Sequence, residues 1–221
     1  MISRISRAGA LLVAAAALVL NGCAARTAPP ARELPAPAAS DGHDRHSASA
    51  LETARVGYAA ADVEFMQRMI HHHAQALVMT GLVAGRADRR ELELLAGRID
   101  ASQRSEIESM RRWLEKRGEH APDPSHAHHD AMTSMPGMLT DAQLAELRAA
   151  TGATFDRLFL ERMIQHHEGA LSMVADLFAT PGAGQESEIF RFATDVDADQ
   201  RAEIARMRNL LNTIPATPNT R

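Results

Sequence analysis

The chain has 221 residues, a formal net charge of −4 at neutral pH and few aromatic residues, namely one Trp, one Tyr and six Phe. A negative balance gives no support for nucleic-acid binding, which favours a basic patch, and a core with so few rings must be built from Leu, Ile, Val, Ala and Met, which suits helices. The single cysteine, Cys23, excludes an internal disulfide.

Residues 1–22 predict an export signal. Arg4 and Arg7 precede an uncharged, mostly apolar run over residues 8–20, which is too short to cross a bilayer because a spanning helix needs about 20 residues. Cys23 follows a small residue at the end of this signal, as in the lipidation site of bacterial lipoproteins. We expect a lipid anchor on Cys23 and an exported, membrane-anchored lipoprotein facing the periplasm or the cell exterior. An ordinary signal with an incidental cysteine is the alternative.

Residues 23–55 predict a flexible tether, because they are rich in Ala and Pro and show no hydrophobic period. Removal of the signal takes two arginines away, so 22 basic residues face 28 acidic ones and the net charge becomes −6. The remaining span, about residues 56–214, has a length that suits one compact domain. We therefore expect an anchored domain that has no nucleic-acid partner.

The chain contains an internal repeat. Residues 65–79 return 94 positions later as residues 159–173, and both copies keep a His-His pair with a Met seven residues after its first His. Residues 103–110 return 97 positions later as residues 200–207, and both copies keep Gln-x-x-Glu-Ile-x-x-Met. The change in offset places a three-residue insertion near Pro181-Gly182 of the second copy.

Helical spacing accounts for the apolar residues of the first repeated block. Phe65, Met69, His72 and Met79 are separated by four, three and seven residues, which places them on one face of a helix. The second copy repeats that stripe, and no segment shows the alternating polarity of a strand. The pattern predicts one core-facing helix in each copy, followed by a second helix that carries the Gln-x-x-Glu block.

These helices predict two αα-hairpins, one over residues 56–118 and one over residues 153–214. The linker between them, residues 119–152, is rich in His and Met and contains a short helix that starts at a Thr140-Asp141-Ala142-Gln143 capping box. We expect an all-α fold, a four-helix bundle with pseudo-twofold symmetry built from the two repeated hairpins.

Both copies share one composite motif: Met-Ile-x-His-His, then Ala-x-x-Met, then Gln-x-x-Glu-Ile-x-x-Met. The matching residues are Met69-Ile70-His71-His72-His73, Ala76, Met79, Gln103, Glu106, Ile107 and Met110, and Met163-Ile164-Gln165-His166-His167, Ala170, Met173, Gln200, Glu203, Ile204 and Met207. Over about residues 60–212 the chain resembles the DUF305 family of exported bacterial proteins. The resemblance implies a ferritin-like bundle, and some members are linked to copper binding and tolerance. The chain departs from the family pattern at His71, where proline is common.

The repeated histidines and methionines are side chains that can bind metal ions. Thioethers are soft ligands that select Cu(I), while imidazole also binds Cu(II), Zn and Ni. Residues three, four and seven apart share one face of a helix, so the ligand-type side chains of each hairpin can face one another. The candidate metal ligands are Met69, His72, His73, Met79, Glu106, Met110, Met163, His166, His167, Met173, Glu203 and Met207.

The same residues have a purely structural alternative. Methionine in a helix stripe usually fills a core. A carboxylate buried between helices needs a partner, so Glu106 and Glu203 can pair with the histidines of the facing helix and bind no metal. Repetition of the whole set in both hairpins favours neither interpretation over the other. It also leaves open whether the two halves hold separate sites or one merged site.

The linker supplies a second candidate metal site. Three histidines and three methionines lie within 13 residues, and Pro136-Gly137 prevents a long helix. A mixed His/Met tract indicates copper, with Cu(I) favoured because thioethers are soft; a solvated low-complexity loop is the alternative. The candidate loop ligands are His126, His128, His129, Met132, Met135 and Met138.

These patterns favour a non-catalytic copper-binding protein at the cell envelope, a buffer or chaperone or a protein of copper tolerance, with another transition metal as the alternative ligand. A ferritin-like metalloenzyme such as an oxidase is the second hypothesis, although the sequence lacks the Glu-x-x-His motif of di-iron bundles. A structural or interaction lipoprotein that is indifferent to metal is the third. The sequence identifies no protein partner and leaves a homo-oligomer open.

Overall fold

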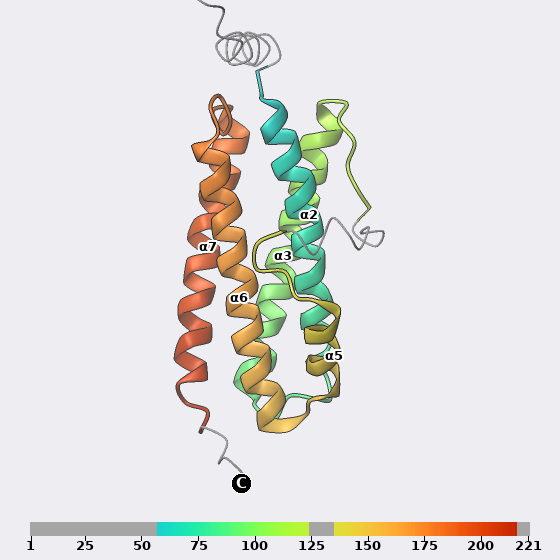
Figure 1. Ribbon diagram of the computed structural model, residues 1–221, viewed down its shortest axis with the longest axis vertical. Helices are drawn as coiled ribbons and strands as arrows, with labels where there is room; N and C mark the ends of the chain where they lie inside the picture. The colour runs from blue at the N-terminus through green and yellow to red at the C-terminus, as the bar shows by residue number, and fades with distance from the viewer. Residues whose placement is uncertain (1–56, 124–134, 216–221) are drawn as a thin grey trace, which may run out of the picture. The chain divides into compact units, whose positions relative to one another are not determined.

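The structure, a computed structural model, describes residues 57–123 and 135–215. Within these residues the chain forms five helices and no strand, which confirms the predicted all-α class. The helices in chain order are α2 (Ala60–Thr80), α3 (Arg90–Lys116), α5 (Asp141–Ala149), α6 (Gly152–Ala179) and α7 (Ser187–Leu211) (Figure 1). None of them is both long enough and apolar enough to cross a membrane.

Several predicted features lie outside the described residues. They are the export signal, the tether with Cys23, and the linker residues His126, His128, His129 and Met132. The structure therefore bears on the helical part of the chain and on the last two methionines of the linker.

The four long helices pack as two antiparallel pairs, α2 with α3 and α6 with α7 (Figure 1). The pairs meet chiefly where α2 lies against α6, with a smaller contact between α3 and α7. The short helix α5 packs against α6. Because α2 and α6 carry the two copies of the His-His block, the repeated histidines come together in the middle of the molecule.

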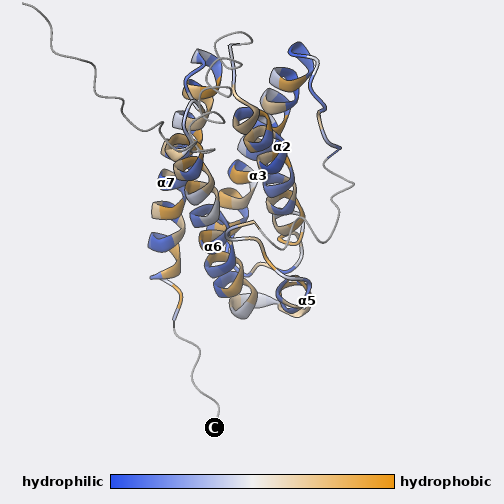
Figure 2. Cartoon of the chain, turned by 45° about the horizontal axis from the view of Figure 1, so that its top comes forward, coloured by the Kyte–Doolittle hydropathy of each residue, from blue (hydrophilic) through white to orange (hydrophobic). Residues whose placement is uncertain are grey.

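Each long helix carries hydrophobic and hydrophilic residues along its whole length (Figure 2). The predicted stripe of α2 is buried at Phe65, Met69, His72 and Met79. The same positions of α6 are buried as well. Burial of one apolar face against a partner helix is what stabilises an amphipathic helix in a protein, so the spacing of the repeat explains why these segments are helical.

The capping box predicted for the short helix is present. The hydroxyl oxygen of Thr140 accepts a hydrogen bond from the backbone N–H of Gln143 at 3.3 Å, and the Gln143 side-chain oxygen accepts one from the backbone N–H of Thr140 at 2.8 Å. These bonds satisfy two donors that the first turn of a helix otherwise leaves without partners. They fix the start of α5 within the linker.

Residues 135–139, here called the strap, lie against α2 and α6. The Gln75 amide binds both backbone groups of Leu139, accepting from its N–H at 2.8 Å and donating to its carbonyl at 2.9 Å. Gly137 has a φ of +76° and packs on Gly169 of α6, where an added Cβ would overlap the Pro136 carbonyl. The strap is therefore held by specific contacts to both hairpins.

The strap buries Met135 and Met138, which the linker composition had placed in a polar loop. Both side chains belong to an apolar core cluster of the helices. The tight seat of the strap on Gly169 brings this segment close enough to pack there. Two of the six candidate loop ligands are thus core residues in the structure.

Two aspartates, 94 residues apart, tie the hairpins to each other. Asp62 at the start of α2 accepts a hydrogen bond from the backbone N–H of Gly184, in the α6–α7 turn, at 2.7 Å. Asp156 at the start of α6 accepts from the backbone N–H groups of Asp88 and Arg89, in the α2–α3 turn, at 3.0 and 3.1 Å. Each hairpin therefore fixes the turn of the other, and the pairing follows the pseudo-twofold symmetry of the sequence.

Candidate metal centre

His72 of α2 and His166 of α6 stack on each other where the two hairpins meet. Their ring centroids lie 3.9 Å apart with an interplanar angle of 38°. Since the two residues are related by the repeat, this contact lies on the pseudo-twofold axis. His72 Nε2 donates to the Pro136 carbonyl at 3.1 Å, and His166 Nε2 donates to the His72 carbonyl at 3.0 Å. A carbonyl only accepts, so both rings carry their proton on Nε2.

A His–Glu pair flanks the stack on each side. His73 Nε2 donates to the carboxylate of Glu106 at 2.6 Å, and His167 Nε2 donates to that of Glu203 at 2.7 Å. Both imidazoles are fully buried. The Glu residues come from α3 and α7, so each hairpin closes its own pair, as the sequence allowed. Direct contact at these distances means that no metal ion separates Nε2 from the carboxylate.

Burial controls the protonation of the stacked rings. Burial, with a smaller contribution from the neighbouring His73, lowers the pKa of His72 to about 3. Burial also puts the pKa of His166 well below its ordinary value, helped by the charges of the other three histidines. Desolvation disfavours a cationic imidazole, so both stacked rings are neutral at neutral pH.

The carboxylate of Glu106 responds to two opposing effects. Burial raises its pKa, but the hydrogen bond and charge of His73, with a second hydrogen bond from Ser102 at 2.8 Å, outweigh burial and leave the pKa below the usual value. His167 of the other hairpin also lowers it. The charges of the two halves thus act on each other, and the halves meet in one cluster around the histidine stack.

Several buried polar atoms of the repeated motif have no hydrogen-bond partner among the described residues. They are Nδ1 of His72, His73 and His167, both amide atoms of Gln103, and the amide oxygen of Gln200. In a neutral imidazole with its proton on Nε2, Nδ1 carries a lone pair, and a carboxylate on the opposite nitrogen is the usual support of a metal-binding imidazole. The donor chemistry therefore fits a metal ion at Nδ1.

The repeated methionines divide between two apolar core clusters. One contains Met69 and Met110 of the first hairpin with Met173 of the second. The other contains Met163 and Met207 of the second hairpin with Met79 of the first. Each cluster thus combines two methionines of one hairpin with one of the other. The helical spacing suggested that Met69 and Met79 converge on one side of α2, but the structure assigns them to different clusters.

The imidazole and carboxylate groups do not by themselves complete a metal site. In residues 57–123 and 135–215, no group of three or more His, Cys, Asp or Glu side chains is placed to hold a metal ion. Thioethers would have to complete the coordination in this conformation. The structure thus brings the predicted histidines and glutamates together in pairs and places the methionines in the surrounding core.

The family model for the domain of unknown function DUF305 matches residues 62–211. The chain belongs to the DUF305 family. The matched range begins within α2 and ends with α7, so it spans both hairpins and the histidine cluster. Among curated proteins, none matches the chain.

Solved structures, DUF305 proteins among them, have the same fold. A DUF305 fragment from Deinococcus radiodurans is 30% identical, with 70% of this chain and 97% of that chain covered and a TM-score of 0.62. A candidate secreted DUF305 protein from Streptomyces coelicolor is 30% identical, with 69% and 92% covered and a TM-score of 0.57. CopM in its Cu(I)-bound form is 27% identical, with 68% and 95% covered and a TM-score of 0.54. CopM has also been solved in Cu(II)-bound and silver-bound forms.

Proposed function

We propose that this DUF305 protein is an exported copper-binding protein that buffers or carries copper at the cell envelope and has no catalytic role. The observation that carries the proposal is the set of buried imidazoles whose Nδ1 atoms have no partner among the described residues, while their Nε2 atoms are fixed by carboxylates or carbonyls. Buried polar atoms are rarely left without partners. Here they lie in a core rich in thioethers.

Copper suits this donor set. Thioethers prefer soft ions such as Cu(I), and imidazole binds both oxidation states of copper. CopM, a protein of similar fold that has been solved with Cu(I), Cu(II) and silver, supports the same choice. The residues that would hold the ion are the histidines and methionines of α2 and α6, with the methionines of α3 and α7, while Glu106 and Glu203 orient the imidazoles.

The remaining features belong to the same proposal. Residues 1–22 direct export, Cys23 carries a lipid anchor, and residues 23–55 tether the domain to the membrane. Residues 56–214 form one domain, which we assign to the ferritin-like four-helix bundles. The linker ligands His126, His128, His129 and Met132 capture copper before it reaches the helices.

Anaerobic competition for Cu(I) against a colorimetric chelator tests this function, using residues 24–221 with Zn(II) and Cu(II) titrated alongside. Tight, stoichiometric retention of Cu(I) is expected. A variant with His72, His73, His166 and His167 all changed to Gln should lose that retention. If this variant binds as tightly as the unaltered chain, the helices do not hold the ion.

A metal-independent structural role is the second candidate. The direct His–Glu contacts of 2.6 and 2.7 Å satisfy Nε2 of both flanking histidines without an ion. This role predicts that the unaltered chain retains no metal in the same competition, and that its melting temperature is the same with and without copper. Copper that binds the native state but not the unfolded state would raise the melting temperature.

A further inference from the structure

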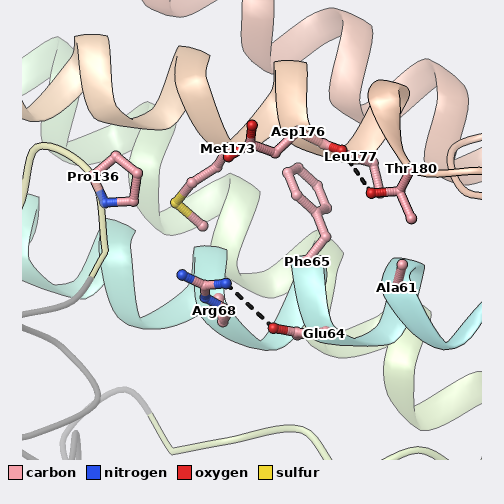
Figure 3. Close-up of a pocket in the computed structure, with 9 residues that line it drawn as sticks. All are labelled: Ala61, Glu64, Phe65, Arg68, Pro136, Met173, Asp176, Leu177 and Thr180. Atoms are coloured by element: carbon pink, nitrogen blue, oxygen red, sulfur yellow. Dashed lines mark hydrogen bonds and ion pairs between the residues drawn. The ribbon is translucent and has the colours of Figure 1, made fainter.

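A pocket of about 130 Å³ lies between α2 and α6 beside the strap. Such a volume far exceeds the roughly 15 Å³ that one water molecule needs. Met173 lines it, and Figure 3 shows this side chain reaching from α6 toward α2, with its sulfur between Pro136 and Phe65. Met173 is 6% exposed, whereas its repeat partner Met79 is fully buried.

The pocket breaks the pseudo-twofold symmetry of the molecule. Ala61 and Glu64 line it on α2, and the residues 94 positions later are Phe155 and Leu158. Phe155 is fully buried, and Leu158 packs against the same core cluster as Met79. A large ring and an apolar side chain thus pack where the first copy has a methyl group and a carboxylate. The two halves share their histidines and methionines but differ at this point.

The pocket adjoins the histidine stack. Pro136 forms part of its wall, and the carbonyl of the same residue accepts the hydrogen bond from His72 Nε2. Met173 follows His166 by seven residues, so both side chains lie on one face of α6. A small ion that reaches the Met173 sulfur is therefore on the histidine face of α6, about two helical turns or about 10 Å along the axis from His166.

The lining of the pocket is negatively charged. Arg68 forms an ion pair with Glu64 at 3.2 Å, and Asp176 adds a second carboxylate. One guanidinium against two carboxylates leaves a net charge of −1. A negative lining raises the local concentration of cations, while the thioether behind it selects soft ones.

We propose that this pocket is the access port through which a soft metal cation such as Cu(I) reaches the buried ligands, with Met173 as the first thioether that it meets. The proposal rests on the proposed function and adds the route. It assigns access to one half of a pseudosymmetric molecule, because the other half is closed by Phe155 and Leu158.

The proposed port is tested by introducing the large side chain of the second copy at the corresponding position of the first copy. Ala61→Phe places the Phe155 side chain at the pocket, and Ala60→Phe puts the same ring on the neighbouring exposed residue as a control. In stopped-flow transfer of Cu(I) from a chromogenic chelator, Ala61→Phe should slow uptake by at least about tenfold, a barrier change of about 1.4 kcal/mol. The final amount of bound copper should stay the same, and Ala60→Phe should load at the unaltered rate.

A metal-free readout checks access directly. Dilute peroxide oxidises exposed methionine sulfur to the sulfoxide, and mass spectrometry of peptides reports each residue. In the metal-free chain Met173 should be oxidised faster than Met79, and Ala61→Phe should remove that difference. Ala61→Leu serves as the smaller substitution if the ring impairs folding as judged by circular dichroism.

The outcomes separate the two proposals. If the unaltered chain binds no metal, the proposed function fails and the port fails with it. If it binds metal but Ala61→Phe loads at the unaltered rate, the port alone is wrong and the function stands. Equal oxidation of Met173 and Met79 in the metal-free chain would likewise overturn the port.

Discussion

At the scale of single residues, the two glutamates determine what the flanking histidines can do. Glu106 holds His73 through Nε2, and Glu203 holds His167 in the same way. Each carboxylate thereby fixes the ring orientation, and in the neutral form of the ring Nδ1 keeps a lone pair. A His–Glu pair with a purely structural role and one that supports a metal ligand therefore have the same hydrogen bond at Nε2. The two roles differ in whether Nδ1 binds a metal ion.

Glu106→Gln and Glu203→Gln should each lower both stability and metal affinity. The amide cannot replace the charge-assisted hydrogen bond to a buried imidazole, so we expect a loss of about 1–3 kcal/mol in the free energy of unfolding. Cu(I) affinity should fall about 10–100-fold, as when supporting partners of metal ligands are removed. Urea unfolding and chelator competition measure the two effects.

Glu108→Gln is the matched control. Glu108 lies on the same helix as Glu106, with its side chain 71% exposed and an Arg112 ion pair of 3.6 Å. Exposed pairs contribute little, so neither quantity should change appreciably. If Glu106→Gln behaves like this control, the His–Glu pair does not support the site.

The stacked histidines should make the metal-free protein sensitive to acid. The pKa of His72 is about 3 in the folded chain against an ordinary value of 6.5, and that of His166 is lowered as well. Between those values the unfolded chain binds more protons than the folded one, so the free energy of unfolding falls as pH drops below about 6.5. Each group contributes a slope of up to about 1.4 kcal/mol per pH unit.

Urea unfolding at pH 7, 6 and 5 measures this slope, and His72→Gln should reduce it by removing one of the two groups. The lowered pKa of Glu106 acts in the same direction, but only below the ordinary glutamate value of 4.5, outside the range tested. A stability that is flat from pH 7 to pH 5 would contradict the neutral, buried stack.

At the scale of elements, the strap distinguishes the two halves at one position of the repeat. Gln75 in α2 and Gly169 in α6 are 94 residues apart. Gln75 binds the strap through its amide, and Gly169 gives the strap room to approach. The substitution of Gly for Gln at this position is thus what allows a single segment to lie against both hairpins.

Gly169→Ala should destabilise the protein. Its Cβ would overlap the Pro136 carbonyl, and the backbone on both sides leaves little room to adjust. Overpacking of this kind costs about 1–3 kcal/mol, and it would also disturb the carbonyl that binds His72. Thermal unfolding of the metal-free chain measures the loss.

Gly97→Ala provides the matched control, because an added Cβ at this α3 position meets nothing within 4 Å. Alanine in a helix interior is more favourable than glycine by about 0.5–1 kcal/mol, so this variant should be slightly more stable. Similar melting temperatures for the two variants would show that the strap is not seated on Gly169.

The sequence predicts the helices and the His–Glu pairs but not the strap or the division of the methionines between two clusters. Helical spacing from Phe65 to Met79 predicts α2 because burial of one face stabilises that helix, and the His–Glu pairs follow from a buried carboxylate that needs a partner. The strap was not predictable, because Met135 and Met138 resemble soft ligands and core residues equally well. The partition of the methionines was not predictable either, since it depends on how the hairpins pack together.

At the scale of the whole molecule, the hairpins are joined by reciprocal contacts of their aspartates. Asp62 and Asp156 keep the 94-residue offset of the histidine block, so the repeat held a signal for them. A short motif search passes over such residues because Asp at the start of a helix usually caps its own helix. Asp62 does cap its own helix, accepting from the backbone N–H of Ala59 at 2.9 Å, but both aspartates also reach the turn of the other hairpin. These contacts hold the two halves, and hence the histidine stack, in register.

The proposed function assigns copper to the helices and to the linker, and one replacement separates the two proposed sites. Exchange of residues 124–134 for a Gly/Ser segment of equal length removes His126, His128, His129 and Met132 but leaves the strap. The melting temperature should not change, and tight Cu(I) retention by the helices should persist with a lower total of bound copper. Extending the exchange through Met138 removes two buried methionines and the hydrogen-bonded strap, which should cost about 2–5 kcal/mol for each methionine side chain lost. If the shorter exchange abolishes all retention, the linker holds the metal and the histidine stack serves only to join the two hairpins.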